Sequence, residues 1–199
     1  MPAPRLRPSR PGDEDALIRI WKLSFGDEDS FINMFFRDFY APGMATVMEC
    51  DDQPVSCVFT LKGVQVSLPG MPELDCAYVY SMGTLPEYRD MGFGARVVQE
   101  CARRAFSDGC DFVCVLPASG SLYRWYEKTL GTRTRFWIRE LKIARRELPE
   151  APPSIRAEAV DPCQYGVLRE KLLFGMPHAR FDGRLLRFQE AICKYYGGG

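Results

Sequence analysis

The stretch TLPEYRDMGFGARVV, residues 84–98, contains the residues whose spacing is most specific for chemistry: Arg89, Gly92 and Gly94 in the pattern R-x-x-G-x-G. An apolar run precedes it and an amphipathic segment follows, which predicts a turn between a strand and a helix that begins near Gly94. The first N–H groups of a helix lack intrahelical acceptors and attract anions, and glycines let an anion approach the backbone closely. The pattern therefore predicts a phosphate-binding turn, in which Arg89 either adds a charged contact or braces the loop.

The other common phosphate-binding patterns are absent or incomplete. A P-loop requires G-x-x-x-x-G-K-[ST], and no such string occurs in the sequence. A dinucleotide-binding fingerprint requires a third glycine where this chain has Val97. A plain connection between a strand and a helix remains the alternative to a phosphate site.

Eight scattered cysteines and a single histidine, His178, restrict the possible metal and thiol chemistry. There is no C-x-x-C motif, so we expect no metal site. Several cysteines lie inside apolar runs, which predicts buried free thiols in a reducing compartment. His178 follows a Gly-Met-Pro turn and is expected to lie in a loop.

The composition is that of an ordinary soluble domain. Lys+Arg and Asp+Glu are equal at 26 each, so the neutral chain has no global electrostatic reason to bind nucleic acid or an acidic membrane. No run of the sequence is long and apolar enough to span a bilayer, and the start lacks the apolar core of a signal peptide. We therefore expect a cytoplasmic protein with no nucleic-acid or membrane partner.

Strands and helices on both sides of the turn must position these residues. Apolar periodicity and turn residues predict strands at 4–10, 76–85, 110–118 and 132–143, and helices at 11–25, 27–40, 94–109 and 119–131. Residues 45–68 are predicted to form further strands, with a hairpin turn at 51–54 and a separate strand at 63–68. The continuous apolar run 110–118 is typical of a strand in the middle of a sheet that is covered on both faces. The aromatic helix at 27–40 either contributes to the core or lines a pocket.

The chain is predicted to divide near residue 150. Residues 1–146 would form one domain, and the Pro- and Ser-containing stretch 147–154 would form a linker. Residues 155–199 would form an appendage, with a strand at 154–160 and helices at 162–174 and 182–196. An apolar helix face in this appendage could pair with a second copy to form a homodimer.

The order of these features resembles the GNAT superfamily of acetyl-CoA-dependent N-acetyltransferases. Arg89–Gly94 matches that family's R-x-x-G-x-G completely, CDFVCVLPA stands where its next parallel strand belongs, and LYRWYEKTLG is similar to its following helix. The resemblance covers about residues 4–143. It implies an α/β (α+β) fold with a mixed, mostly antiparallel central sheet, helices on both faces, and two splayed parallel strands at the cofactor cleft.

The chain also departs from the family pattern. From Tyr126 to Gly131 the step is five positions where the family usually has four, and Thr132 follows where an aromatic residue is common. Ser119-Gly120-Ser121 replaces an asparagine that is frequent in the preceding loop. More weakly, the early helices and the tail together are similar to the enhanced-intracellular-survival acetyltransferases, in which a second acetyltransferase-like half follows the first.

The resemblance implies a role for each matching residue. The amides of the pantetheine arm of acetyl-CoA would pair with β-strand residues Met82, Gly83 and Thr84. The pyrophosphate would bind the backbone N–H groups of the turn, namely those of Arg89, Asp90, Met91, Gly92, Phe93, Gly94 and Ala95. Tyr126 would be the general acid for the leaving thiolate, with Tyr123 in reserve. The general base is not identified, and Asp75, Tyr78, Tyr80 and Glu49 are the candidates.

The implied activity is N-acetyl transfer from acetyl-CoA directly to an amine of a small molecule or peptide. The alternative is a catalytically impaired acyl-CoA-binding module with a sensory or assembly role. The altered spacing after Tyr126 and the missing base keep this alternative open.

Overall fold

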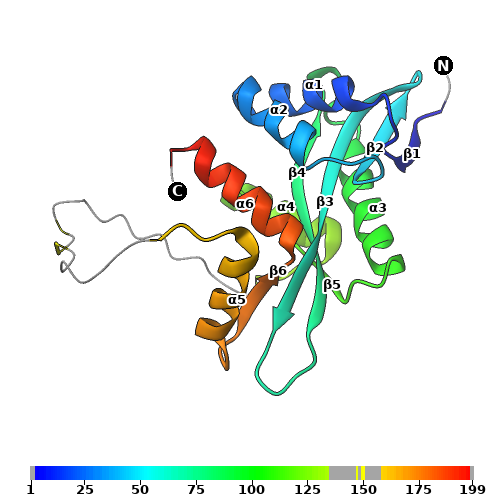
Figure 1. Cartoon of the computed structure of the whole chain (residues 1–199). Coiled ribbons are helices and arrows are strands. Elements are labelled where there is room, and N and C mark those ends of the chain that lie inside the picture. The colour runs from blue at the N-terminus through cyan, green and yellow to red at the C-terminus, as the bar shows by residue number, and fades with distance from the viewer. Residues whose placement is uncertain (1–2, 135–146, 148, 151–157, 198–199) are drawn as a thin grey trace.

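The computed structural model describes residues 3–134, 147, 149–150 and 158–197 (Figure 1). Helices cover a central sheet, and the segment after residue 158 packs back onto that sheet. In chain order the elements are β1 (Arg5–Pro8), α1 (Glu14–Phe25), α2 (Asp29–Asp38), β2 (Ala45–Cys50), β3 (Gln53–Ser67), β4 (Leu74–Thr84), the short 3-10 helix η1 (Pro86–Tyr88), α3 (Phe93–Ser107), β5 (Phe112–Cys114), α4 (Gly120–Leu130), α5 (Pro162–Leu173), β6 (His178–Phe181) and α6 (Gly183–Tyr195).

The described strands form one mixed sheet. The path runs β1–β2–β3–β4–β5, and β6 pairs with β3 beside it. Every neighbouring pair is antiparallel except β4 and β5, which are parallel. The expected mixed, mostly antiparallel sheet with one parallel pair is therefore confirmed.

β3 is a single strand of 15 residues, so the separate strand that we expected from Gly63 is wrong. Gly63 has a φ of +91°, and the pairing with β4 shifts between Leu61 and Val64, so the strand bulges at this point and continues. A Cβ on Gly63 would collide with the side chain of Asp182, whose N–H donates to the Gly63 carbonyl at 2.8 Å. Glycine at position 63 therefore lets the C-terminal segment, which contains Asp182, pack on the bulge.

Alternate residues of β3 and β4 point to opposite faces of the sheet, as a pleated strand requires. Phe59 lies 5.5 Å from Trp21 of α1 and 5.3 Å from Phe35 of α2, measured between ring centroids. The neighbouring Thr60 places its hydroxyl 3.0 Å from the Cys101 sulfur of α3. Helices α1 and α2 therefore cover one face and α3 the other, in agreement with the helices on both faces that the resemblance implies.

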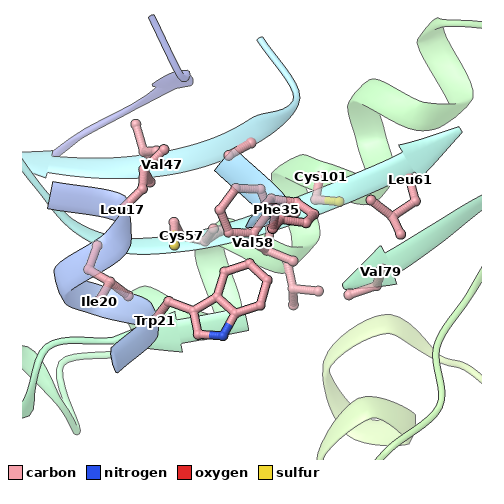
Figure 2. Close-up of a cluster of buried hydrophobic side chains, with 14 of the residues drawn as sticks. Leu17, Ile20, Trp21, Phe35, Val47, Cys57, Val58, Leu61, Val79 and Cys101 are labelled. Carbon is pink, nitrogen blue, oxygen red and sulfur yellow. The ribbon is translucent and has the colours of Figure 1, made fainter. Parts of the chain in front are cut away.

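The core is the set of buried apolar side chains on both faces of this sheet (Figure 2). Trp21 is 2 % exposed and Phe35 is fully buried, so the middle of the aromatic helix α2 contributes to the core. Burying a large aromatic side chain contributes roughly 1.5–3 kcal/mol relative to leaving it exposed. The helix spacing predicted at 27–40 is thus explained chiefly by packing.

β5 differs from its expectation. Only Phe112–Cys114 are extended, these residues are half-buried, and within the described chain β5 pairs with β4 alone. A strand covered on both faces is therefore not what the described residues show. The strand predicted at 132–143 falls outside the described residues from 135 onward, as does most of the range 147–157 that contains the predicted linker.

The C-terminal segment packs closely on the first part of the chain. Its helices α5 and α6 lie where the sequence predicts them, and Asp161 and Gln164 form a capping box at the start of α5. Strand β6 was not expected, and His178 is its first residue rather than part of a loop. In Figure 1, α6 lies beside α2, and the rings of Phe188 and Phe39 stack at a centroid distance of 4.2 Å. The division into residues 1–146, 147–154 and 155–199 stays a prediction.

Candidate functional site

The parallel strands β4 and β5 pair over only a few residues and then diverge. Their pairing runs from Cys76↔Phe112 to Tyr78↔Cys114, where β5 ends. β4 continues to Thr84 with β3 on one side. Beyond Tyr78 its other edge has no strand partner among the described residues, so backbone N–H and C=O groups are available there.

The free part of β4 is shaped by a bulge. Ser81 has a φ of +46°, and the pairing with β3 shifts between Cys57 and Phe59. A Cβ on Gly83 would collide with the hydroxyl of Ser24 near the end of α1. Gly83 is therefore the residue that allows α1 to pack directly on the end of β4.

Arg89 braces the turn after β4. Its Nε donates to the Thr84 carbonyl at 3.2 Å, and its Nη2 donates to the Leu23 carbonyl at 3.4 Å. The Leu85 N–H also donates to the Val55 carbonyl at 2.9 Å, which holds the start of the turn against β3. Of the two sequence-based possibilities, the structure shows the bracing contact of Arg89.

The turn places the uncapped N-terminus of α3 at the end of β4. Gly92 is the N-cap of α3 with a φ of +75°, and no side chain caps this helix. The N–H groups of Phe93, Gly94 and Ala95 precede the first intrahelical bond, which the Arg96 N–H donates to Gly92. Asp90, at φ +62°, and Met91 are exposed in the turn that leads into it.

Gly94 lies beside the last residues of β4. A Cβ on Gly94 would be 3.6 Å from Thr84 Oγ1 and 3.8 Å from Met82 Cε, which are ordinary contact distances. A Cβ on Gly92 would meet no atom within 4 Å. The structure therefore brings Met82, Gly83 and Thr84 together with the start of α3, and the space in front of Gly92 is open.

The two candidate tyrosines lie on α4. Tyr126 is 6 % exposed and packs edge-to-face on Trp125 at 4.9 Å, and burial raises the pKa of its phenol to about 12. Tyr123 is half-buried. Both rings line a cavity of about 490 Å³ together with Cys114 at the end of β5. Both tyrosines therefore line the same cavity as the end of β5.

Two of the four candidate bases lie away from this point. Asp75 is near the first residue of β4, where it accepts a hydrogen bond from Gln65 at 3.0 Å. Glu49 is buried among arginines; burial alone would raise its pKa, but hydrogen bonds from Arg7 and Arg5 outweigh burial and lower it. A carboxylate with a lowered pKa is a weak proton acceptor.

The other two candidates, Tyr78 and Tyr80, belong to β4 itself. Burial raises the pKa of both phenols, that of Tyr80 to about 12. A phenol with a raised pKa keeps its proton at neutral pH and cannot act as a base without losing it. The structure therefore identifies no strong base among the four candidates.

His178 lies at the far end of β3, opposite Ser67. Its Nε2 is 2.9 Å from a Glu170 oxygen and its Nδ1 is 2.8 Å from the Met176 carbonyl oxygen. No cluster of three or more His, Cys, Asp or Glu side chains in the described part of the chain is arranged to hold a metal ion.

The cysteines only partly match the sequence-based expectation. They are free thiols, and Cys57, Cys76 and Cys101 are buried as expected, whereas Cys163 and Cys193 are exposed. None of the described helices combines the length and apolar character needed to cross a membrane.

Comparison with known proteins assigns this fold to a family. The profile of the acetyltransferase (GNAT) domain matches residues 5–128, more than half of the chain. The chain therefore belongs to the GNAT acetyltransferase family, which confirms the resemblance seen in the sequence. No curated protein sequence matches the chain.

Solved structures share the fold at low sequence identity. An acetyltransferase from Trypanosoma brucei is 17% identical with a TM-score of 0.51, and the match covers 71% of this chain and 100% of that one. An aminoglycoside N-acetyltransferase in complex with CoA is 11% identical with a TM-score of 0.55, covering 71% and 96%. A GCN5-related N-acetyltransferase from Kribbella flavida is 21% identical with a TM-score of 0.50, covering 62% of this chain and 33% of that one.

Proposed function

We propose that this chain transfers an acetyl group from acetyl-CoA directly to an amine of a small molecule or peptide. The observation that supports the proposal is the position of Gly94 beside Met82 and Thr84. It places the uncapped start of α3 next to the free edge of β4, so that one elongated ligand could contact both. Family membership makes acyl-CoA the ligand to test first.

The chain's own groups fit such a ligand. The pantetheine amides would pair with the backbone of Met82, Gly83 and Thr84, as an added strand pairs with a sheet edge. The pyrophosphate would accept hydrogen bonds from the N–H groups of the turn and of the first turn of α3, from Asp90 to Ala95. The Arg89 N–H already donates to the Pro86 carbonyl at 3.3 Å. Gly92 and Gly94 leave the space for this contact, and the Arg89 side chain holds the turn in position.

Acetyl-CoA supplies the acetyl thioester and the leaving thiolate. Overall, one C–N bond forms and one C–S bond breaks, while the amine loses a proton and the thiolate gains one. With its pKa raised to about 12, Tyr126 keeps its proton at neutral pH. We propose that it donates a hydrogen bond to the developing thiolate, with Tyr123 as the reserve donor. Neutral amine is required as the nucleophile, and the base is left unassigned.

Release of coenzyme A tests the proposal. With purified full chain, acetyl-CoA and a panel of amines, we expect amine-dependent release of free thiol and N-acetylated product by mass spectrometry. Binding of coenzyme A, measured by calorimetry, should be lost in Gly92→Glu because a carboxylate would occupy the phosphate position. If wild type neither binds coenzyme A nor differs from Gly92→Glu, the proposed site is wrong.

A second candidate function is an acyl-CoA-binding module without catalysis. The five-residue step from Tyr126 to Gly131 and the lack of a strong base among the candidates favour it. Binding of coenzyme A with no turnover on any amine would support this module and contradict the enzyme. Residence in the cytoplasm and the absence of nucleic-acid or membrane partners remain predictions in either case.

Self-association through the C-terminal segment is also proposed. Helix α5 has no buried residue, and the apolar side chains of Val167, Leu172 and Phe174 are 57%, 78% and 89% exposed. Exposed apolar groups of this kind are typical of an interaction surface. Sedimentation equilibrium should give the mass of a dimer, and Leu172→Glu should give a monomer.

A further inference from the structure

A second cavity, of about 510 Å³, lies between the α1–α2 connection and the last turn of α6. It is lined by residues that are far apart in the sequence, namely Gly26, Asp27, Glu28, Ser30, Phe31, Tyr195 and Tyr196. The C-terminal segment therefore completes this cavity, although neither the turn motif nor α4 contributes to it.

The cavity lies beside the end of β4. The Trp21 ring donates from Nε1 to an Asp27 oxygen at 2.7 Å and lies 5.7 Å from the Tyr80 ring of β4. Ser24, only two residues before the cavity begins at Gly26, packs against Gly83. The cavity is thus close to Gly83, one of the three β4 residues on which the proposed function places the pantetheine arm that carries the thioester.

The two carboxylates of the cavity are oriented by neutral donors. Asp27 accepts from the Trp21 indole, and Glu28 accepts from the Tyr195 hydroxyl at 2.7 Å. Neither carboxylate has a Lys or Arg partner within the described chain, whereas the adjacent Asp29 pairs with Lys22 at 2.7 Å. Asp27 and Glu28 therefore line the cavity as two carboxylates that no Lys or Arg side chain of the described residues pairs with.

Aromatic rings form the remaining wall. Phe31 and Tyr195 lie 5.4 Å apart in an edge-to-face arrangement, and Tyr195 and Tyr196 lie 5.1 Å apart at 89°. An ammonium ion is attracted both by carboxylates and by the faces of aromatic rings. The chemistry of this cavity therefore matches an organic cation better than an anion or a neutral group.

We propose that this cavity binds a second, non-reacting ammonium group of the acceptor, so that the acceptor is a diamine or a longer polyamine. Carboxylates favour the protonated form of an amine, and a protonated amine has no lone pair with which to attack a thioester. The ammonium held at Asp27 and Glu28 is therefore not the nucleophile. A second amine of the same molecule reaches the end of β4, and this assignment rests on the proposed function.

Direct binding tests the cavity independently of catalysis. Calorimetry on the full chain without acetyl-CoA should show binding of 1,5-diaminopentane and none of 1,5-pentanediol, its uncharged match. The double variant D27N/E28Q should weaken diamine binding by roughly tenfold or more, because two charges are removed. Both positions are exposed, so the variant should fold, and its circular dichroism and its affinity for coenzyme A should equal those of wild type.

Asp15→Asn is the matched control, because it removes an exposed negative charge on α1 outside the cavity. This control should bind the diamine as wild type does. Tyr195→Phe keeps the ring but removes the hydrogen bond to Glu28, and it should cause a smaller, few-fold loss. Equal affinity of wild type and D27N/E28Q for the diamine would overturn the proposal.

Measurements of turnover with different amines distinguish the cation site from the proposed acetyl transfer. As acceptors, 1,5-diaminopentane should be acetylated with a kcat/KM roughly tenfold or more above that of pentylamine, whose single ammonium occupies the cavity unproductively and inhibits. Diamine binding that depends on Asp27 and Glu28, with no coenzyme A release from any amine, would overturn the proposed function and leave the cation site standing. Equal kcat/KM for the two amines would overturn the diamine assignment.

Discussion

Arg89 illustrates how a motif residue can act on the backbone around it. Its guanidinium donates to the carbonyls of Thr84 and Leu23 and so joins β4, the turn and α1. In the proposed site, the backbone N–H groups of the turn would therefore be the main hydrogen-bond donors to the pyrophosphate, while the Arg89 side chain holds the turn in position. At the scale of single residues, the proposed chemistry depends on Tyr126.

Tyr126→Phe should lower kcat by about 100-fold and leave KM for acetyl-CoA nearly unchanged, because only the hydrogen bond to the leaving thiolate is removed. The ring and its packing on Trp125 are retained. Because the pKa of Tyr126 is raised to about 12, the phenol is protonated throughout the range from about pH 7 to 10, and kcat should not fall there through its ionisation. Coenzyme A release measured across this range checks both points.

Tyr123→Phe is the companion variant on the same helix. It should keep most of the activity if Tyr126 is the donor. A large loss in Tyr123→Phe with normal activity in Tyr126→Phe would transfer the role to the reserve residue.

At the scale of elements, two glycine variants at the start of α3 should differ in their effect on the unfolding free energy while both weaken coenzyme A binding. Gly94→Ala adds a Cβ at ordinary contact distance from Thr84 and Met82, so the fold should tolerate it. Gly92→Ala forces a side chain into the left-handed region at φ +75° and should cost about 1 kcal/mol or more of unfolding free energy. Urea titration and coenzyme A calorimetry on both variants should show weaker binding in each, with lower stability only in Gly92→Ala.

An ion network connects β1, β2 and the start of α1. Arg7 pairs with Asp13 at 2.6 Å and with Glu49 at 2.5 Å, and these side chains are 10%, 6% and 5% exposed. For both carboxyls burial would raise the pKa, but hydrogen bonds from Arg7 help to lower it overall. Removing one member of a buried pair leaves an unbalanced charge, at a cost of roughly 3–5 kcal/mol.

This network predicts acid sensitivity. A carboxyl whose folded pKa is lowered stabilises the fold fully above its unfolded pKa, near 4, and this contribution is lost as the pH falls. The unfolding free energy should therefore decline in wild type as the pH falls below about 5. Glu49→Gln should show lower stability near neutral pH and a shallower decline, which urea titrations at several pH values would measure. A decline as steep as that of wild type would contradict the network's role.

At the scale of the whole molecule, the C-terminal segment is joined to the first helices. Phe188 of α6 stacks on Phe39 and contacts Phe35 at 5.5 Å, and Tyr195 bonds to Glu28. Strand β6 also pairs with β3, at residues 64–67, which lie beyond the stretch of β3 that pairs with β2. These contacts predict that the segment stabilises the sheet it covers.

Phe188→Ala should lower the unfolding free energy by about 3–5 kcal/mol, because it empties a buried aromatic position. Thermal unfolding followed by circular dichroism should show a single transition at a lower temperature. Phe106→Ala on α3, at a side chain that is 54% exposed and outside the proposed self-association surface, is the matched control and should change little. A second unfolding transition at lower temperature in Phe188→Ala would instead indicate that the C-terminal segment unfolds independently of the sheet.

Most elements of the first 134 residues could be predicted because their signals are local. Helical spacing such as that of Val97, Val98 and Cys101 reports one buried face, and a glycine marks the end of α1 and of α4. Gly63 was misread as a strand end because a bulge and a turn use the same residue type. Strand β6 escaped prediction because it directly follows a Gly-Met-Pro turn and is defined by its pairing with β3, a contact between distant residues that no local pattern reports.

By itself the sequence determined the turn, its flanking strand and helix, and through them the GNAT family, since a backbone anion site needs only glycines and an arginine at fixed local spacing. Tertiary structure alone decided that Arg89 braces the turn, that Glu49 is held by arginines, and that Tyr195 meets Glu28. Such contacts join residues up to 167 positions apart, and no local pattern encodes them. They depend on how α1 packs on the turn, how β1 pairs with β2, and how the C-terminal segment returns to the first helices, which only the packing of the whole chain establishes.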